Sequence, residues 1–256
     1  MNNDLNIFGA VKIKVPEAIF KNATEYIFNH NQVTNFDHLT SKITSQNNDD
    51  FAIIAKKPNR LLNRKTSNKI NEWVCNDKQI KKILKSEELF ISKISKYETQ
   101  FREDLNTNDL DIFYRLVRKD RMDVGPPHYD QLIWEQGKGT NLEVIYDKKK
   151  FTRWKLWIPL LGSNEKNSLQ FIKGSHLENV PWYYEPSRIT QAVEATKSNG
   201  SPAIDPKWIE KNEHRFKSIA WEKGEGVIFD DKLVHRGPIN KSSKLRTSIE
   251  FTILAS

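Results

Sequence analysis

From residue 108 onward the chain is a succession of short segments rich in aromatic and β-branched residues, and this pattern restricts the possible folds more than any other feature. The segments read DIFYRLVR (111–118), FTRWKLWIPLL (151–161), SLQFIKGSH (168–176), FKSIAWEKGEGVIF (216–229) and LRTSIEFTIL (245–254). Gly, Pro, Asn and Asp lie between them, as is typical of strands connected by turns. Because many short strands follow a few helices, we expect a mostly β fold of two sheets with flanking helices.

The first part of the chain has a different pattern. Apolar residues recur at three- and four-residue spacing in VPEAIFKNATEYIFNHN (15–31) and KQIKKILKSEELFISKISKYETQF (78–101), which predicts two amphipathic helices. Residues 32–68 between them are polar and irregular, and are predicted to be loop. We therefore expect a single domain over 1–256, in which a mainly helical part, 1–107, packs on a β core, 108–256.

One long stretch of the second half, 181–214, does not fit the succession of strands. It is aromatic and interrupted by prolines, and it is predicted to be an insertion over one end of the sheet. Long insertions of this kind are often functional lids, and a purely structural excursion is an equally good interpretation.

Composition narrows the class of protein. A chain of 256 residues with 37% hydrophobic residues can form one large domain with a sizeable core. The single cysteine, Cys75, excludes an intramolecular disulfide and a multi-cysteine zinc site, and its neighbours NEWVCN predict a packed, inert thiol on a helix. The N-terminus has no apolar signal-type stretch, and no apolar run approaches the ~18 residues of a membrane span. We expect a soluble, cytoplasmic protein with no membrane partner.

The net charge of +8 raises the question of nucleic-acid binding. The basic residues are spread along the chain, and 33 acidic residues lie among them. Short clusters such as KKPNRLLNRK (56–65) and YDKKKFTRWK (146–155) are more often solvated surface. We therefore expect no nucleic-acid partner.

The run PPHYD places His128 and Asp130 two residues apart directly after two prolines. On a strand such residues point to the same face, so an imidazole and a carboxylate would lie side by side. Taken alone, an H-x-D pair is more often a surface hydrogen bond than a metal site. A third ligand is needed.

That ligand is found in GEGVIFDDKLVHRGPINKSSKLRTSIEF, where His235 follows an apolar strand and a polar turn. Arg246 and Ser248 share one face of the next strand, and a guanidinium beside a hydroxyl can bind both oxygens of a carboxylate. His128, Asp130 and His235 together supply two nitrogens and one carboxylate oxygen. This set is the facial triad of iron oxygenases, which leaves three positions of octahedral iron open. Zinc fits less well, because its structural sites are closed and use sulfur.

These motifs resemble the Fe(II)- and 2-oxoglutarate-dependent oxygenases of the phytanoyl-CoA dioxygenase type. The resemblance rests on PPHYD, on WKLWIPLL with SLQFIKGSH, and on GEGVIFDDKLVHRGPINKSSKLRTSI; it covers roughly 108–254 well and the helices loosely. It implies a double-stranded β-helix core, a cupin-like jelly roll. It also implies that the triad holds iron and that Arg246 binds the distal carboxylate of 2-oxoglutarate. Trp157 would line the cosubstrate pocket, with Ser248 and Tyr114 as weaker candidates.

The chain departs from the family at two positions, where Ser168 and Lys173 replace a usual glycine and proline. Both changes affect turn geometry and the substrate-side wall rather than the iron site. His176, in the GSH turn, is expected to be structural. Asp230 and Asp231 are alternative carboxylates, but the resemblance and the pairing with His128 favour Asp130.

The resemblance implies a dioxygenase that uses Fe(II), 2-oxoglutarate and O2, hydroxylates an unactivated C–H bond of a small molecule, and releases succinate and CO2. A cluster of cations favours an anionic substrate: Arg115, Arg118, Arg121, Arg153 and Lys155. The same cations could instead face solvent or neutralise 2-oxoglutarate. The alternative function is a non-catalytic jelly-roll protein that binds a small ligand and retains the triad. The sequence makes no prediction of oligomeric state.

Overall fold

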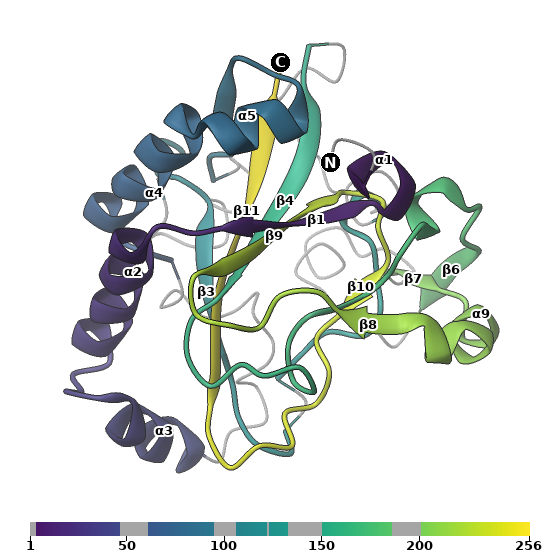
Figure 1. Ribbon diagram of the computed structural model, residues 1–256. Helices are drawn as coiled ribbons and strands as arrows, with labels where there is room; N and C mark the ends of the chain where they lie inside the picture. Colours follow the sequence, from purple (N-terminus) through teal and green to yellow (C-terminus); the bar gives the residue numbers. More distant parts are fainter. Residues whose placement is uncertain (1–3, 47–60, 95–105, 122, 133–149, 186–200) are drawn as a thin grey trace.

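The computed structural model describes residues 4–46, 61–94, 106–121, 123–132, 150–185 and 201–256. A large antiparallel sheet forms its centre, helices from the N-terminal part lie against one face of this sheet, and a smaller sheet lies on its other side (Figure 1). None of the helices in these ranges has the length and apolar character needed to cross a bilayer.

Several of the described helices begin at a side-chain cap. Asn35, Asn63 and Asp77 each accept a hydrogen bond of 2.9 Å from the backbone N–H three residues on, which satisfies a donor at a helix start. The described helices are α1 (Asp4–Phe8), α2 (Glu17–His30), α3 (Phe36–Thr44), α4 (Arg64–Asn76), α5 (Lys78–Leu84) and α9 (Pro206–Asn212), with the short 3₁₀ turns η4 (Ser175–Leu177) and η5 (Glu213–Arg215).

The large sheet is built around the C-terminal strand. Its strands, in spatial order, are β1 (Ala10–Lys14), β9 (Glu225–Asp230), β4 (Thr152–Pro159) and β11 (Arg246–Ala255), with β2 (Leu89–Ile91) and β3 (Ile112–Val117) both paired to the far side of β11. Every pairing is antiparallel. Two strands from the N-terminal part, 1–107, therefore complete a sheet whose other strands come from residues 108–256.

The smaller sheet has the order β10 (His235–Arg236), β5 (Gln170–Ile172) and β8 (Phe216–Ser218) among the described strands. A separate pair is formed by β6 (Trp182–Glu185) and β7 (Ser201–Ile204). Phe171 of β5 and Phe229 of β9 meet with ring centroids 4.9 Å apart, within an apolar cluster between the two sheets. This arrangement of facing antiparallel sheets confirms the predicted jelly-roll core with flanking helices.

The two faces of β11 have different roles. Ile249, Phe251 and Ile253 belong to the large apolar core shared with the helices. The alternate residues Arg246 and Ser248 point to the opposite, inner face, because successive side chains of a strand alternate. The alternation expected from the sequence therefore separates a packing face from a polar face.

Several predicted elements need correction. The helix expected over 78–101 ends at Leu84, because Lys85 adopts a left-handed conformation with φ of 53° and the chain continues into β2. Residues 95–101 of that prediction lie outside the described ranges. The loop expected over 32–68 contains α3 and the start of α4, and its residues 47–60 are outside the described ranges.

The predicted insertion, 181–214, contains β6, β7, α9 and most of η5, while its residues 186–200 lie outside the described part of the chain. Ile204 and Trp208 pack in one apolar cluster with Tyr129, which precedes Asp130 within PPHYD, and with Leu132, two residues after Asp130. The insertion therefore supports the segment that carries two of the candidate ligands. The division of the chain into a single domain with these boundaries stays a prediction.

Candidate active site

A short antiparallel bridge brings the two candidate histidine ligands together. The backbone N–H of His128 donates to the carbonyl of His235 at 3.0 Å, and the reverse bond measures 2.9 Å. Because directly opposite residues of an antiparallel pair point to one side, the two imidazoles are neighbours, with ring centroids 4.4 Å apart. Two histidines that lie 107 positions apart in the sequence thus meet at one point.

Backbone carbonyls fix the orientation of both rings. Nδ1 of His128 lies 2.8 Å from the carbonyl oxygen of Pro126, and Nδ1 of His235 lies 2.9 Å from that of Leu233. A carbonyl can only accept, so each Nδ1 carries the proton and each Nε2 presents a lone pair toward the partner side chains. This is the arrangement by which a neighbouring hydrogen bond prepares a histidine for metal binding.

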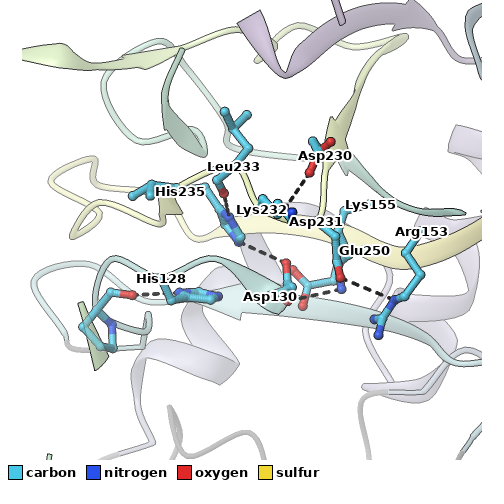
Figure 2. Close-up of polar contacts among 12 residues, drawn as sticks. His128, Asp130, Arg153, Lys155, Asp230, Asp231, Lys232, Leu233, His235 and Glu250 are labelled. Atoms are coloured by element: carbon cyan, nitrogen blue, oxygen red, sulfur yellow. Dashed lines mark hydrogen bonds and ion pairs between the residues drawn. The ribbon is translucent and has the colours of Figure 1, made fainter. Parts of the chain in front are cut away.

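Asp130 completes the cluster, as Figure 2 shows. His128, Asp130 and His235 each offer one ligand atom, and these three atoms all lie within 4.8 Å of one another. Oδ2 of Asp130 lies 3.5 Å from Nε2 of His235 and has no hydrogen-bond partner within the described part of the chain. A buried carboxylate oxygen without a partner is unfavourable unless a cation completes it. The donor set and this unsatisfied oxygen fit an iron(II) ion.

The protonation states also suit a metal. Burial lowers the pKa of His235, which keeps its ring neutral at neutral pH. Burial alone would raise the pKa of Asp130, but the positive charges of Lys155 and Arg153 oppose it and hold that pKa below its usual value. The site therefore presents a neutral imidazole and an ionised carboxylate, the forms that ligate a metal.

Ion pairs surround the cluster on the inner face of the large sheet. The pairs are Lys155 Nζ with Asp130 Oδ1 at 3.5 Å, Arg153 Nε with Asp231 Oδ2 at 3.5 Å, and Arg115 with Glu250. These charges are neutralised within the protein, so they give no argument for an anionic substrate. Arg118, another cation of the predicted cluster, is likewise paired with a carboxylate, that of Asp123.

The two other candidate carboxylates do not join the triad. Asp230 accepts a hydrogen bond of 2.8 Å from the backbone N–H of Lys232. Asp231 faces Arg153, and burial raises the pKa of its carboxyl to about 6. Asp130 is the carboxylate that the structure brings to the two histidines.

Arg246 and Ser248 form a second polar feature on the inner face of β11. Arg246 is 2% exposed and Ser248 is fully buried. One Nη of Arg246 donates to the carbonyl of Asn167, but its Nε and the Oγ of Ser248 have no hydrogen-bond partner among the described residues. Burial and the nearby Arg115 lower the pKa of Arg246 to about 10, so the group remains charged at neutral pH. Two buried donors left open in this way fit the carboxylate of a bound cosubstrate.

Gly237 links this pair to the histidine segment. A Cβ at position 237 would lie 3.1 Å from an Nη of Arg246 and 2.9 Å from Cγ1 of Val124. The guanidinium therefore packs directly on the backbone two residues after His235. The absence of a side chain at this glycine allows the approach.

The remaining predicted residues lie in different places. Trp157 is 1% exposed and packs in the apolar cluster between the sheets, on the inner face opposite Glu250. Tyr114 is a correction: it lies on the outer face of β3, in the core shared with the helices, where its ring meets that of Tyr26 edge-on. Successive side chains of a strand point to opposite faces. Arg115 faces inward, so its neighbour Tyr114 faces outward, and the sheet lies between Tyr114 and the site. His176 contacts the carbonyl of Asn6 through Nε2, as expected of a structural histidine.

Two facing antiparallel sheets with a His-Asp-His cluster between them define the class of mononuclear non-haem iron enzymes. The family description "Phytanoyl-CoA dioxygenase (PhyH)" matches residues 40–248. The chain belongs to the phytanoyl-CoA dioxygenase family, and it is an oxygenase that depends on Fe(II) and 2-oxoglutarate. No curated protein sequence matches the chain significantly.

Solved structures similar to this chain agree with the fold. EctD from S. alaskensis, solved with 2-oxoglutarate and 5-hydroxyectoine, aligns with a TM-score of 0.52 at 14% identity, over 99% of this chain and 74% of that one. EvdO2 from Micromonospora carbonacea var. aurantiaca, complexed with 2-oxoglutarate, gives 0.51 at 13% identity, over 100% and 89%. SnoK, a non-heme alpha ketoglutarate dependent carbocyclase from nogalamycin biosynthesis, gives 0.51 at 12%, over 99% and 82%.

Proposed function

We propose that this oxygenase hydroxylates an unactivated C–H bond of a small molecule, with His128, Asp130 and His235 as iron ligands and Arg246 as the cosubstrate anchor. The observation that carries the proposal is a group of three buried polar atoms that have no hydrogen-bond partner among the described residues: Oδ2 of Asp130, Nε of Arg246 and Oγ of Ser248. One is an acceptor that a metal ion would satisfy, and two are donors that a carboxylate would satisfy.

The residues of the chain prepare the site for that chemistry. Bound iron and 2-oxoglutarate supply oxidation by dioxygen, in which the cosubstrate loses CO2 to become succinate and the substrate gains one oxygen atom. The carbonyl-held histidines and Asp130 present their ligand atoms within 4.8 Å of one another. Arg246 and Ser248 bind and orient the distal carboxylate of 2-oxoglutarate, and the apolar wall with Trp157 excludes water.

The cosubstrate assignment is tested through Arg246. Replacing Arg246 by Ala removes a charge-assisted contact in a buried pocket, a loss of about 2–5 kcal/mol. The dissociation constant for 2-oxoglutarate should therefore rise roughly 30-fold or more. Arg246→Lys should recover part of the affinity, because an ammonium lacks the planar fork. The measurement is anaerobic titration of 2-oxoglutarate into the Fe(II) protein, followed by the visible metal-to-ligand charge-transfer absorption.

Arg64→Ala serves as the matched control, since Arg64 forms a surface ion pair with Asp109 and should leave the titration unchanged. Equal affinities in wild type and Arg246→Ala would remove the cosubstrate assignment. A wild type that binds neither Fe(II) nor 2-oxoglutarate would instead favour the non-catalytic ligand-binding alternative.

The reaction type is tested separately. A panel of small molecules is screened for succinate formation, and each active compound is then turned over under isotopically labelled dioxygen. Hydroxylation predicts a product that carries one labelled oxygen atom. A product of unchanged oxygen content, as a cyclisation or desaturation would give, would contradict hydroxylation and leave the oxygenase class intact.

A further inference from the structure

The two oxygens of Asp130 face different groups. Oδ1 lies 3.5 Å from Nζ of Lys155, whereas Oδ2 lies 3.5 Å from Nε2 of His235 and has no hydrogen-bond partner among the described residues. The side chains of Lys155 and Asp130 are both 14% exposed, so water competes weakly with their contact. One oxygen of the carboxylate thus faces the lysine, and the other faces His235 (Figure 2).

Lys155 reaches this position from the sheet. It lies on β4 on the same face as Trp157, and its register partners are Phe229 on β9 and Thr252 on β11. The rigid central strands of the large sheet therefore hold the base of the lysine side chain, while Asp130 comes from a segment outside the named strands. A cation on a rigid element can fix a ligand on a less regular one.

Neighbouring cations have carboxylates of their own. Arg153 lies beside Asp231, and Arg115 is paired with Glu250. Lys155 is the cation that the described residues place against the triad carboxylate itself.

We propose that Lys155 is a positioning residue that occupies Oδ1 of Asp130, so that the carboxylate binds the metal through Oδ2 alone. The inference rests on the proposed function, because it takes Asp130 as a metal ligand. Binding through Oδ2 alone determines how many coordination positions of the metal stay open. An octahedral metal with one atom from each of three protein ligands keeps about three positions open, and a chelating carboxylate would occupy one of them.

The loss of the lysine charge should change the way in which Asp130 binds. Without the ammonium, Oδ1 would be a buried carboxylate oxygen without its cation, which is unfavourable. The metal would then be the nearest cation, and the carboxylate would turn so that both oxygens contact it. Lys155→Met tests this, because methionine has a similar length and no charge. Lys155→Arg keeps the charge and is the conservative variant.

The probe is Mn(II), which prefers octahedral oxygen and nitrogen sites and does not oxidise readily. Water-proton relaxation of the bound Mn(II) reports how many exchangeable water molecules it carries, independently of turnover. We expect about three waters in wild type and in Lys155→Arg, and about two in Lys155→Met. Lys12→Met is the control, since Lys12 is a strand lysine paired with Glu225 at an exposed site and should give the wild-type value.

The outcomes separate this inference from the proposed function. A wild-type protein that binds no Mn(II) would remove both the proposed triad and the role of Lys155. Wild type and Lys155→Met with the same number of waters and the same Mn(II) affinity would overturn the role of Lys155 alone. Circular dichroism checks folding, and Lys155→Gln, which removes the charge and keeps a polar group, is judged by the same criterion if Lys155→Met does not fold.

Discussion

Three buried polar atoms that have no hydrogen-bond partner in the described part of the chain lie on the residues proposed to bind iron and cosubstrate: Oδ2 of Asp130, Nε of Arg246 and Oγ of Ser248. Folded proteins satisfy most buried polar groups, and each exception requires an explanation. Here one explanation applies to all three atoms, because a metal ion would bind the carboxylate oxygen and a cosubstrate carboxylate would accept hydrogen bonds from the two donors. The individual residue is therefore the scale at which the proposed function is best supported.

Asp231 provides a pH-dependent test at this scale. Burial raises the pKa of its carboxyl to about 6 in the folded state, against about 3.9 in an unfolded chain. The folded protein therefore binds this proton more tightly than the unfolded chain does. As a result, the free energy of unfolding decreases by up to about 3 kcal/mol as the pH rises from about 4 to about 6. Asp231→Asn mimics the protonated form. Its melting temperature should match wild type near pH 4 and exceed it above pH 6, as measured by circular dichroism.

Asp37→Asn is the matched control, since Asp37 is an exposed aspartate of α3 that pairs with Lys244 at the surface. Its difference from wild type should stay small across the same pH interval, because exposed ion pairs contribute little to stability. A difference between Asp231→Asn and wild type that is constant with pH would show that burial does not raise the pKa of Asp231.

At the scale of single elements, strand β11 separates stability from cosubstrate binding. Ile249→Ala empties part of the helix-facing core and should reduce the free energy of unfolding by about 2–5 kcal/mol. Ser248→Ala, one residue away on the inner face, removes a donor to the cosubstrate carboxylate and should weaken 2-oxoglutarate binding about tenfold or more. Denaturant unfolding and anaerobic 2-oxoglutarate titration of both variants check the separation. Equal effects of the two substitutions on both quantities would contradict the assignment of the two faces.

The segment between β3 and the triad depends on a buried ion pair. Arg118 and Asp123 are each 1% exposed and form two side-chain hydrogen bonds of 2.8 and 2.7 Å. Asp123→Asn leaves the guanidinium buried without its counter-charge, which should cost about 3–5 kcal/mol and weaken Fe(II) binding. Asp120→Asn, in the same segment, removes an exposed pair with Lys241 and should leave both quantities unchanged. Denaturant unfolding and metal analysis provide the measurements; an Asp123→Asn protein with wild-type stability and iron content would contradict this role.

The sequence predicts some of these elements and not others. β3, β4 and β11 follow from aromatic and β-branched runs bounded by turn residues, and the inner face of β11 follows from alternation. β2 could not be predicted, because the apolar spacing of 78–101 is helical and the strand forms through pairing of Leu89–Ile91 with the distant end of β11. The contact of Lys155 with Asp130 also depends on the folded path of a non-strand segment. The prediction that Tyr114 lines the cosubstrate pocket is wrong, because its position on the strand before the triad does not say which face of the sheet its side chain occupies.

At the scale of the whole molecule, the large sheet separates two cores. Its outer face packs against α2 to α5 in the larger apolar cluster, and its inner face carries the ion pairs, the triad and the smaller cluster with Trp157 (Figure 1). The N-terminal part also contributes β1 and β2 to this sheet. The helices therefore stabilise the surface from which the site residues project, while the opposite sheet supplies His235.

The proposed function as a whole depends on iron binding by the triad. The most direct measurement is anaerobic Fe(II) binding to wild type, His235→Ala and His38→Ala, with metal content and the charge-transfer absorption after addition of 2-oxoglutarate as readouts. His38 is an exposed histidine of α3 and provides the matched control. Wild type and His38→Ala should bind stoichiometric iron and show the absorption band. His235→Ala should keep its fold and lose both, with a fall in affinity well beyond the roughly 10- to 100-fold typical of groups that only support a ligand. Iron content and an absorption band in folded His235→Ala equal to those of wild type would contradict the proposed iron site.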